Sequence, residues 1–163
     1  MLKKLLQIIL LTTTLFSYEI VIDKTSQIPK ELVPKWGATF TRDDAKEVVV
    51  NDKTGLMWQD DKTAKTVKKD WQGAKDYCQA LNFAGFDDWY LPRISELETL
   101  INTIKYDPAI KDGFKHIISS FYWSSSLNVY YSKYAWYIYF RYGGSDNGSK
   151  ADKRYIRCVR IGQ

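Results

Sequence analysis

The sequence is poor in the residue types on which common catalytic and metal sites depend. It has one histidine, His116, and two cysteines in 163 residues. One His and two well-separated Cys do not make an ordinary zinc site. Neither cysteine belongs to a Cys-x-x-Cys motif and no Gly-rich phosphate loop is present, which argues against redox catalysis and nucleotide binding. A Ser–His–acid triad would have to use His116, which has no recognisable nucleophile motif nearby, so we expect His116 to be structural.

Paired acidic residues are the remaining candidates for acid–base chemistry or calcium binding. Asp60-Asp61 and Asp87-Asp88 are two such pairs, but adjacent carboxylates of this kind usually lie in turns. Asp146 and Asn147, beside Gly148, could also supply oxygen ligands, yet they lack the spacing of a calcium loop. We therefore predict no metal and no cofactor, and calcium stays chemically possible without a supporting motif. The protein is predicted not to be an enzyme.

The sequence has only one apolar run long enough to suggest a targeting segment. Leu5 to Phe16 is free of charge and follows Lys3 and Lys4, which is typical of a secretory signal peptide cleaved after Ser17. An uncleaved anchor or a buried helix are the alternatives. No Cys follows the run, which argues against a lipoprotein, and no later stretch could span a bilayer. The sequence thus predicts a soluble mature protein in the periplasm or outside the cell.

The charge distribution gives no sign of a nucleic-acid partner. Two of the five net positive charges belong to the predicted signal peptide, and the other basic residues are interleaved with Asp and Glu. No basic stripe results, so nucleic acid is not an expected partner. Aromatic residues are plentiful instead, with six Trp and twelve Tyr. Many Trp indicate a core of large rings, whereas many Tyr are more typical of amphipathic surfaces.

Strand and turn signals open the predicted folded region. Residues 18–22 have the character of an edge strand and residues 27–37 look irregular, so residues 18–45 form an approach to a domain at 46–163. Residues 47–51 and 56–59 are predicted as a hairpin joined by a turn at 52–55.

Two helices are predicted next, each with an apolar face. The first is capped by Asp70, and the second is expected to start at Ser95, with Glu98 completing a capping box. The buried positions of the two helices are respectively Trp71, Ala74, Cys78 and Leu81, and Leu97, Leu100, Ile101 and Ile104.

Strand patterns dominate after Pro108. Strands are predicted at 121–125, 135–141 and 154–161, with turns at Gly143-Gly144 and Asn147-Gly148. The last strand is apolar at both parities, as expected for a central strand covered on both sides. Helices followed by a meander of strands predict an α+β fold.

Strict alternation in residues 135–141 identifies the candidate binding residues. Trp136, Ile138 and Phe140 share one face, and the other face is predicted to point outward. The ligand-contact candidates are first Tyr137, Tyr139 and Arg141, and then Tyr130, Tyr131, Tyr134 and Asn147. The alternative is that these tyrosines only cover the sheet.

The two cysteines are Cys78, on the apolar face of the first helix, and Cys158, in the last strand. An even number of cysteines in an exported protein favours a disulfide. Two buried free thiols are the alternative.

Five segments, in order, resemble the Lcl C-terminal domain family, named for the terminal domain of a collagen-like bacterial adhesin. The resemblance covers roughly residues 46–161. Two positions depart from the family pattern: Tyr90 stands where Arg is usual, and Arg93 where a small hydroxylic residue is usual. The segments are residues 54–59; Trp71 with Ala74, Tyr77-Cys78 and Leu81; 88–92 with Glu96-Leu97; 122–126 with 135–137; and 155–160.

The resemblance implies a fold similar to C-type lectins and the formylglycine-generating enzyme, with two helices flanking a small twisted antiparallel sheet. It also implies a Cys78–Cys158 bridge, since C-type lectin-like domains pair these two positions. No Glu-Pro-Asn sugar motif and no reactive cysteine pair accompany the resemblance, so no active site is transferred.

Three functional hypotheses follow. The first is a non-catalytic binding module of the cell envelope that recognises glycan or extracellular polymer through a Tyr-rich face. The second is a structural or protein–protein domain that docks on an envelope protein in the periplasm. The third is an enzyme of unfamiliar chemistry.

Overall fold

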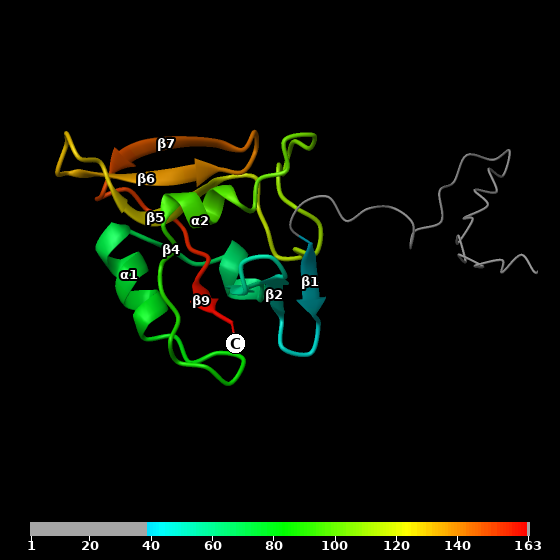
Figure 1. Cartoon of the computed structure of the whole chain (residues 1–163). Coiled ribbons are helices and arrows are strands. Elements are labelled where there is room, and N and C mark those ends of the chain that lie inside the picture. Colours follow the sequence, from blue (N-terminus) through cyan, green and yellow to red (C-terminus); the bar gives the residue numbers. More distant parts are fainter. Residues whose placement is uncertain (1–38, 163) are drawn as a thin grey trace, which may run out of the picture. The chain divides into compact units, whose positions relative to one another are not determined.

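The computed structural model describes residues 39–162 (Figure 1). The predicted signal peptide, the edge strand at 18–22 and the irregular segment at 27–37 lie outside the described residues. None of the helices described within residues 39–162 has the length and the hydropathy of a membrane span. The described part is α+β and mostly strands, as predicted, with two α-helices and one short 3-10 helix.

Four strands form the first sheet, in the order β1-β2-β3-β9, with antiparallel neighbours. The strands β2 and β3 are the hairpin predicted from the sequence, and Val49 lies opposite Trp58. The bounds are Phe40–Asp43 for β1, Val48–Asn51 for β2, Leu56–Gln59 for β3 and Val159–Ile161 for β9.

Five strands form the second sheet, in the order β4-β8-β5-β6-β7. All neighbours are antiparallel except β5 and β8, which are parallel. The small sheet implied by the resemblance is therefore two sheets in the described residues. The bounds are Lys68–Lys69 for β4, Phe121–Leu127 for β5, Tyr134–Tyr139 for β6, Gly144–Ser149 for β7 and Arg154–Tyr155 for β8.

The predicted final strand at 154–161 is wrong as a single element. The chain leaves the second sheet after β8, crosses through residues 156–158, and joins the first sheet as β9. The three crossing residues are fully buried. Ile156 and Cys158 belong to an apolar cluster, whereas Arg157 between them pairs with Asp60. All three residues are therefore buried, which explains why the sequence shows no alternation of buried and exposed positions here.

The last hairpin also differs from its prediction. Its turn includes Gly143, at φ +77°, a left-handed conformation that glycine adopts without strain. Asn147 and Gly148, predicted as a second turn, lie inside β7 and pair with Trp136 and Ala135 of β6. The strand β6 ends at Tyr139, so Phe140 and Arg141 belong to the turn.

The first helix, α1 (Trp71–Gln79), confirms its predicted cap and buried face. The Asp70 carboxylate accepts a hydrogen bond from the backbone N–H of Gly73 at 2.8 Å. Trp71, Ala74 and Cys78 are buried. Leu81 follows the helix and is half-buried.

The second helix, α2 (Ile94–Glu98), starts earlier and is much shorter than predicted. Arg93 is the N-cap, and its backbone N–H donates to the Glu96 carboxylate at 2.7 Å, so the Ser95–Glu98 capping box is wrong. Leu97 and Leu100 are buried, but Ile104 is 91% exposed, because the helix ends six residues before it.

The two helices cover opposite faces of the second sheet. Successive residues of a strand point to opposite faces, and on β5 Trp123 packs with Trp71 of α1 whereas Tyr122 packs with Leu97 of α2. Each face therefore has its own apolar cluster, and a large aromatic ring lies at the centre of each.

Cys78 of α1 and Cys158, just before β9, form the predicted disulfide. Both residues are fully buried. The bridge ties the first helix to the segment that crosses between the sheets.

Replacing Cys78 and Cys158 together by Ala should lower the free energy of unfolding by about 3–5 kcal/mol, because the bridge joins residues 80 positions apart and restricts the unfolded chain. Urea denaturation followed by Trp fluorescence measures the effect, with the oxidised wild type as reference. An unchanged midpoint would show that packing alone holds α1 in place.

Candidate functional site

The predicted contact residues lie in two groups at opposite ends of β6. Tyr130, Tyr131 and Tyr134 are at its start, whereas Tyr139 and Arg141 are at its end. At roughly 3.3 Å per residue, the two ends of this strand are about 16 Å apart. The structure therefore does not gather all of the candidates on one surface. Asn147, on the neighbouring β7, lies opposite Trp136 and is half-buried.

Tyr137, in the middle of β6, is 8% exposed, so its predicted outward position is wrong. Its ring contacts Phe121 edge-on at a centroid distance of 5.2 Å and lies 6.1 Å from the Trp123 ring. Burial, and after it the Asp146 carboxylate, which accepts from the Tyr137 hydroxyl at 3.2 Å, raises the pKa of that phenol. Tyr137 is part of the core of this sheet face.

The guanidinium of Arg154 covers this aromatic face. Its central carbon lies 3.9 Å from the ring centroid of Tyr137, 4.7 Å from that of Trp123 and 5.1 Å from that of Phe121. Such cation–π contacts are favourable where water is largely excluded, and the Arg154 side chain is 12% exposed. No sequence pattern predicts this stack, because Arg154 is distant along the chain from the rings that it covers.

Gly148 leaves the space that the Arg154 guanidinium occupies. A Cβ atom at position 148 would overlap Nη2 of Arg154 and approach the Tyr137 ring to 3.2 Å. The glycine at this position therefore serves close packing, not the turn that the sequence suggested.

Gly148→Ala should destabilise the domain by about 1–2 kcal/mol, because the new methyl group displaces Arg154 from the aromatic rings. Gly144→Ala is the matched control on the same strand, since a Cβ there meets nothing within 4 Å. Thermal and urea unfolding of the two variants measure the difference. Equal stabilities would contradict the proposed role of Gly148.

Residues 127–134, from the last residue of β5 to the first residue of β6, form what we call the aromatic loop. Asn128 fixes its backbone: the side-chain oxygen accepts from the N–H groups of Tyr130 at 2.9 Å and Tyr131 at 3.1 Å. The Asn128 N–H donates to the Tyr134 carbonyl at 3.1 Å, and the Tyr134 N–H donates to the Tyr131 carbonyl at 2.8 Å. The loop therefore has a defined conformation.

The side chains of the aromatic loop point into solvent although its backbone is fixed. Val129 and Tyr130 are each 87% exposed and Tyr131 is 64% exposed, and Leu127 and Tyr134 are exposed beside them. The Tyr131 and Tyr134 rings lie 5.8 Å apart between centroids. Lys150 donates to the Ser132 carbonyl at 2.7 Å and also lies over the Trp71 ring. The result is an exposed apolar and aromatic surface on an ordered support.

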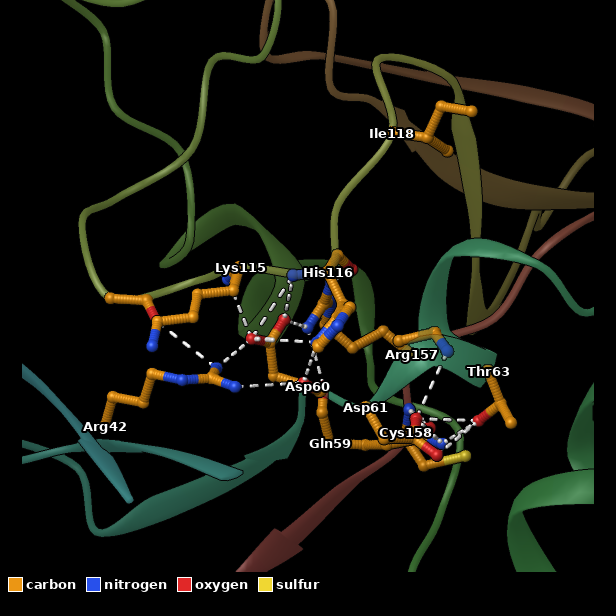
Figure 2. A network of polar contacts seen from close by, with 12 residues as sticks. Arg42, Gln59, Asp60, Asp61, Thr63, Lys115, His116, Ile118, Arg157 and Cys158 are labelled. Carbon is orange, nitrogen blue, oxygen red and sulfur yellow. Dashed lines mark hydrogen bonds and ion pairs between the residues drawn. The ribbon is translucent and has the colours of Figure 1, made fainter. Parts of the chain in front are cut away.

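A buried polar network lies at the junction of the sheets (Figure 2). Arg157 Nη1 donates to Asp60 Oδ1 at 2.7 Å, and both side chains are fully buried. Asp60 Oδ2 accepts from Arg42 and from the backbone N–H of Lys115. Arg157 Nη2 donates to the carbonyl of His116 at 2.6 Å. Asp60 is therefore a fully buried ion-pair partner, and the expectation that this acidic pair lies in a turn is wrong for Asp60.

The neighbours of Asp60 are held by the same network. His116 Nδ1 lies 2.6 Å from the Asp60 carbonyl oxygen, so the single histidine contacts the backbone that carries this carboxylate. Asp61 caps the 3-10 helix η2 (Lys62–Lys65) by accepting from the N–H of Ala64. The described contacts of His116, Asp60 and Asp61 are thus structural.

Asp60→Asn should lower the free energy of unfolding by about 3–5 kcal/mol, because it leaves the buried Arg157 charge without its counter-ion. Asp44→Asn is the control, since Asp44 also pairs with Arg42 but lies in solvent. We expect little change from that substitution. Urea denaturation of both variants tests the prediction, which fails if the two lose the same stability.

A shallow groove of ≈ 480 Å³ lies among residues 104–117, away from the aromatic loop along the chain. The exposed side chains of Ile104 and Tyr106 line it together with Ile110, Phe114 and Ile117. A smaller hollow of ≈ 180 Å³ includes Tyr90, one of the two departures from the family pattern. Burial, together with the hydrogen bond to Glu96, raises the pKa of Tyr90 to about 12.

The comparison with known families agrees with this description. The family model of the Lcl C-terminal domain matches residues 47–160, which is most of the chain. The protein therefore belongs to the Lcl C-terminal domain family, as the sequence segments indicated. No curated protein matches the chain.

Within that family pattern, the two unusual residues take on local roles. The hydroxyl of Tyr90 donates to the Glu96 carboxylate at 3.0 Å, and Arg93 supplies the N-cap backbone of α2. Arg160 pairs with Asp88: its Nε donates to Oδ1 at 2.6 Å and its Nη2 to Oδ2 at 3.0 Å. The Arg160 guanidinium also lies 3.7 Å from the centroid of the Phe86 ring. Asp88, an acid-pair candidate in the sequence, is therefore an ion-pair partner.

Proposed function

We propose that this protein is a non-catalytic binding module of the bacterial cell envelope that recognises glycan or extracellular polymer through its aromatic loop. The supporting observation is the combination of a fixed backbone with exposed rings. Tyr130 and Tyr131 expose most of their surface while Asn128 holds their N–H groups. A fold gains nothing from apolar rings in water, so such a surface indicates a contact with another molecule.

The chemistry of tyrosine suits a sugar ligand. A Tyr ring offers a flat apolar face to the C–H face of a sugar ring, and its hydroxyl can donate to or accept from sugar hydroxyls. It has few rotatable bonds, so little entropy is lost when it is immobilised. The loop presents two such rings in sequence at Tyr130 and Tyr131, and a third at Tyr134.

The structure favours this end of β6 over the residues ranked first from the sequence. Tyr139 stacks on Phe121 at a centroid distance of 4.3 Å and is half-buried, and Tyr137 is in the core. Arg141 is exposed and lies 3.8 Å from Asp107. Ligand contact by Tyr139 and Arg141 stays a prediction, and in our proposal they belong to a secondary surface.

A docking role on an envelope protein is the second candidate. The observation that favours it is the aliphatic area beside the tyrosines, at Val129 and Leu127, which sugars use less than protein surfaces do. The same proposal places the mature protein in the periplasm or outside the cell after removal of residues 1–17. The disulfide between α1 and the segment before β9 supports the export and the C-type-lectin-like fold that we propose.

A glycan array probed with the wild type and with the Tyr130→Ala, Tyr131→Ala double variant tests the proposal. The affinity for any glycan that the wild type binds should fall about tenfold or more, because each substitution removes a ring that is buried against the ligand. Tyr142→Ala is the matched control, since Tyr142 has the same 64% exposure as Tyr131 but lies beyond the other end of β6.

Equal binding by the double variant would remove the aromatic loop from the site. A loss with Tyr142→Ala alone would move the site to the other end of β6. If no glycan binds and a partner protein is captured through the loop in a pull-down, the second candidate replaces the first.

A further inference from the structure

The strand β7 is the outer edge of the second sheet, next to β6 (Figure 1). The N–H of Lys150 donates to the carbonyl of Lys133, so the even-numbered residues here turn their backbone groups toward β6. Backbone directions alternate along an antiparallel strand, and the N–H and C=O groups of Ser145, Asn147 and Ser149 consequently face outward. Two of these groups already have partners in the same chain: the Asn147 N–H donates to the Asp146 carboxylate at 2.7 Å, and the Ser149 carbonyl accepts from the Asp152 N–H at 3.0 Å. Within the described residues, no further strand lies beyond β7.

The sequence of β7 does little to protect this edge. Edge strands commonly carry lysine, proline or a bulge that prevents pairing with another chain. β7 reads Gly144, Ser145, Asp146, Asn147, Gly148, Ser149, and pairs with β6 in unbroken register. Its side chains are small, and its one charge is Asp146. Another strand can therefore approach closely.

The charges beside β7 are self-complementary. We propose that a second copy of this chain pairs with β7 in antiparallel register about a two-fold axis at Asn147. In that register Asp146 of each copy lies directly opposite Gly148 of the other, on the same face of the sheet. The guanidinium of Arg154 occupies the side-chain space of Gly148. Each Asp146 carboxylate thus meets the Arg154 guanidinium of the other copy, and the pair occurs twice.

Both groups have capacity for this contact. Among residues 39–162, Asp146 accepts hydrogen bonds from Tyr137 and Asn147 but forms no ion pair. Arg154 binds Asp152 through Nη2, and its Nε is buried and therefore closed to another chain, whereas its terminal Nη1 forms no hydrogen bond within residues 39–162. A symmetric interface needs one patch that is complementary to itself. Asp146 lies two residues before Gly148, which the Arg154 guanidinium covers, so this edge carries both charges of the pair.

The dimer joins the two five-stranded sheets into one continuous sheet of ten strands. The aromatic loop precedes β6 and is not part of the edge strand β7 that pairs. The inference is therefore independent of the proposed ligand, and each can fail without the other.

Sedimentation equilibrium of the oxidised protein, with two edge variants, tests the dimer. Asn147→Pro removes an N–H that β6 does not use and that donates to the Asp146 carboxylate of its own chain at 2.7 Å. The monomer should stay folded without this surface hydrogen bond, since proline is tolerated where a strand faces solvent. Asp146→Lys puts a positive charge beside the Arg154 guanidinium of the other copy. Both should raise the dimer dissociation constant at least tenfold. Asp112→Lys, the same charge change at an exposed residue away from β7, should leave it unchanged.

A single cysteine fixes the register. In the proposed pairing Asn147 faces itself across the axis at about 5.5 Å between Cα atoms, so Asn147→Cys should oxidise to a covalent dimer. Ser145→Cys should not, because Ser145 lies opposite Ser149 of the other copy. Three results would each overturn the proposal: a wild type that stays monomeric at about 0.5 mM, a dimer unaffected by Asn147→Pro, or equal cross-linking by the two cysteine variants.

Discussion

The ion pair between Asp60 and Arg157 is the contact on which the rest of the domain depends. Asp60 directly follows β3, and Arg157 lies in the segment that leaves one sheet and enters the other. Through the backbone of Lys115 and His116, the pair also holds the chain that leads to β5 (Figure 2). Neither charge tolerates burial alone, because its desolvation is repaid only by its partner and the surrounding hydrogen bonds. The pair therefore fixes the segment that crosses from β8 to β9, and Cys158, the next residue, links that segment to α1.

The aromatic residues of the domain are of two kinds, those that fill the core and those that face solvent. Rings such as Trp58, Trp89 and Trp123 are fully buried, and they fill the clusters on either side of the sheets. The rings at Tyr130 and Tyr131 contribute nothing comparable to the core, yet their backbone is held by Asn128. The high aromatic content of the sequence thus has two causes: a core built from large side chains, and a solvent-facing surface on a rigid support.

The sequence predicted the features that depend on neighbouring residues. The Asp70 cap, the β2–β3 hairpin and the apolar face of α1 arise from hydrogen bonds and periodicities within a few positions. The cysteine pair was predictable from its count and from the family pattern. The features that were missed depend on partners far along the chain: Asp60 looked like a turn residue because Arg157 is 97 positions away, and Tyr137 looked exposed because nothing local announces Arg154 above it. Ile104 fitted the helical spacing, but α2 ends at Glu98. For the site, composition predicted tyrosine-rich contacts, which stay a prediction, and the exposure of each tyrosine changes their order along β6.

The central claim is that a ligand contacts the domain through the aromatic loop, and chemical-shift mapping tests it most directly. A titration of the ¹⁵N-labelled protein with a bound glycan should shift the amide signals of residues 127–134 and of adjacent Lys150, while those of residues 104–117 and 139–142 stay in place. Shifts concentrated in residues 104–117 or 139–142, with the aromatic loop unaffected, would contradict the account.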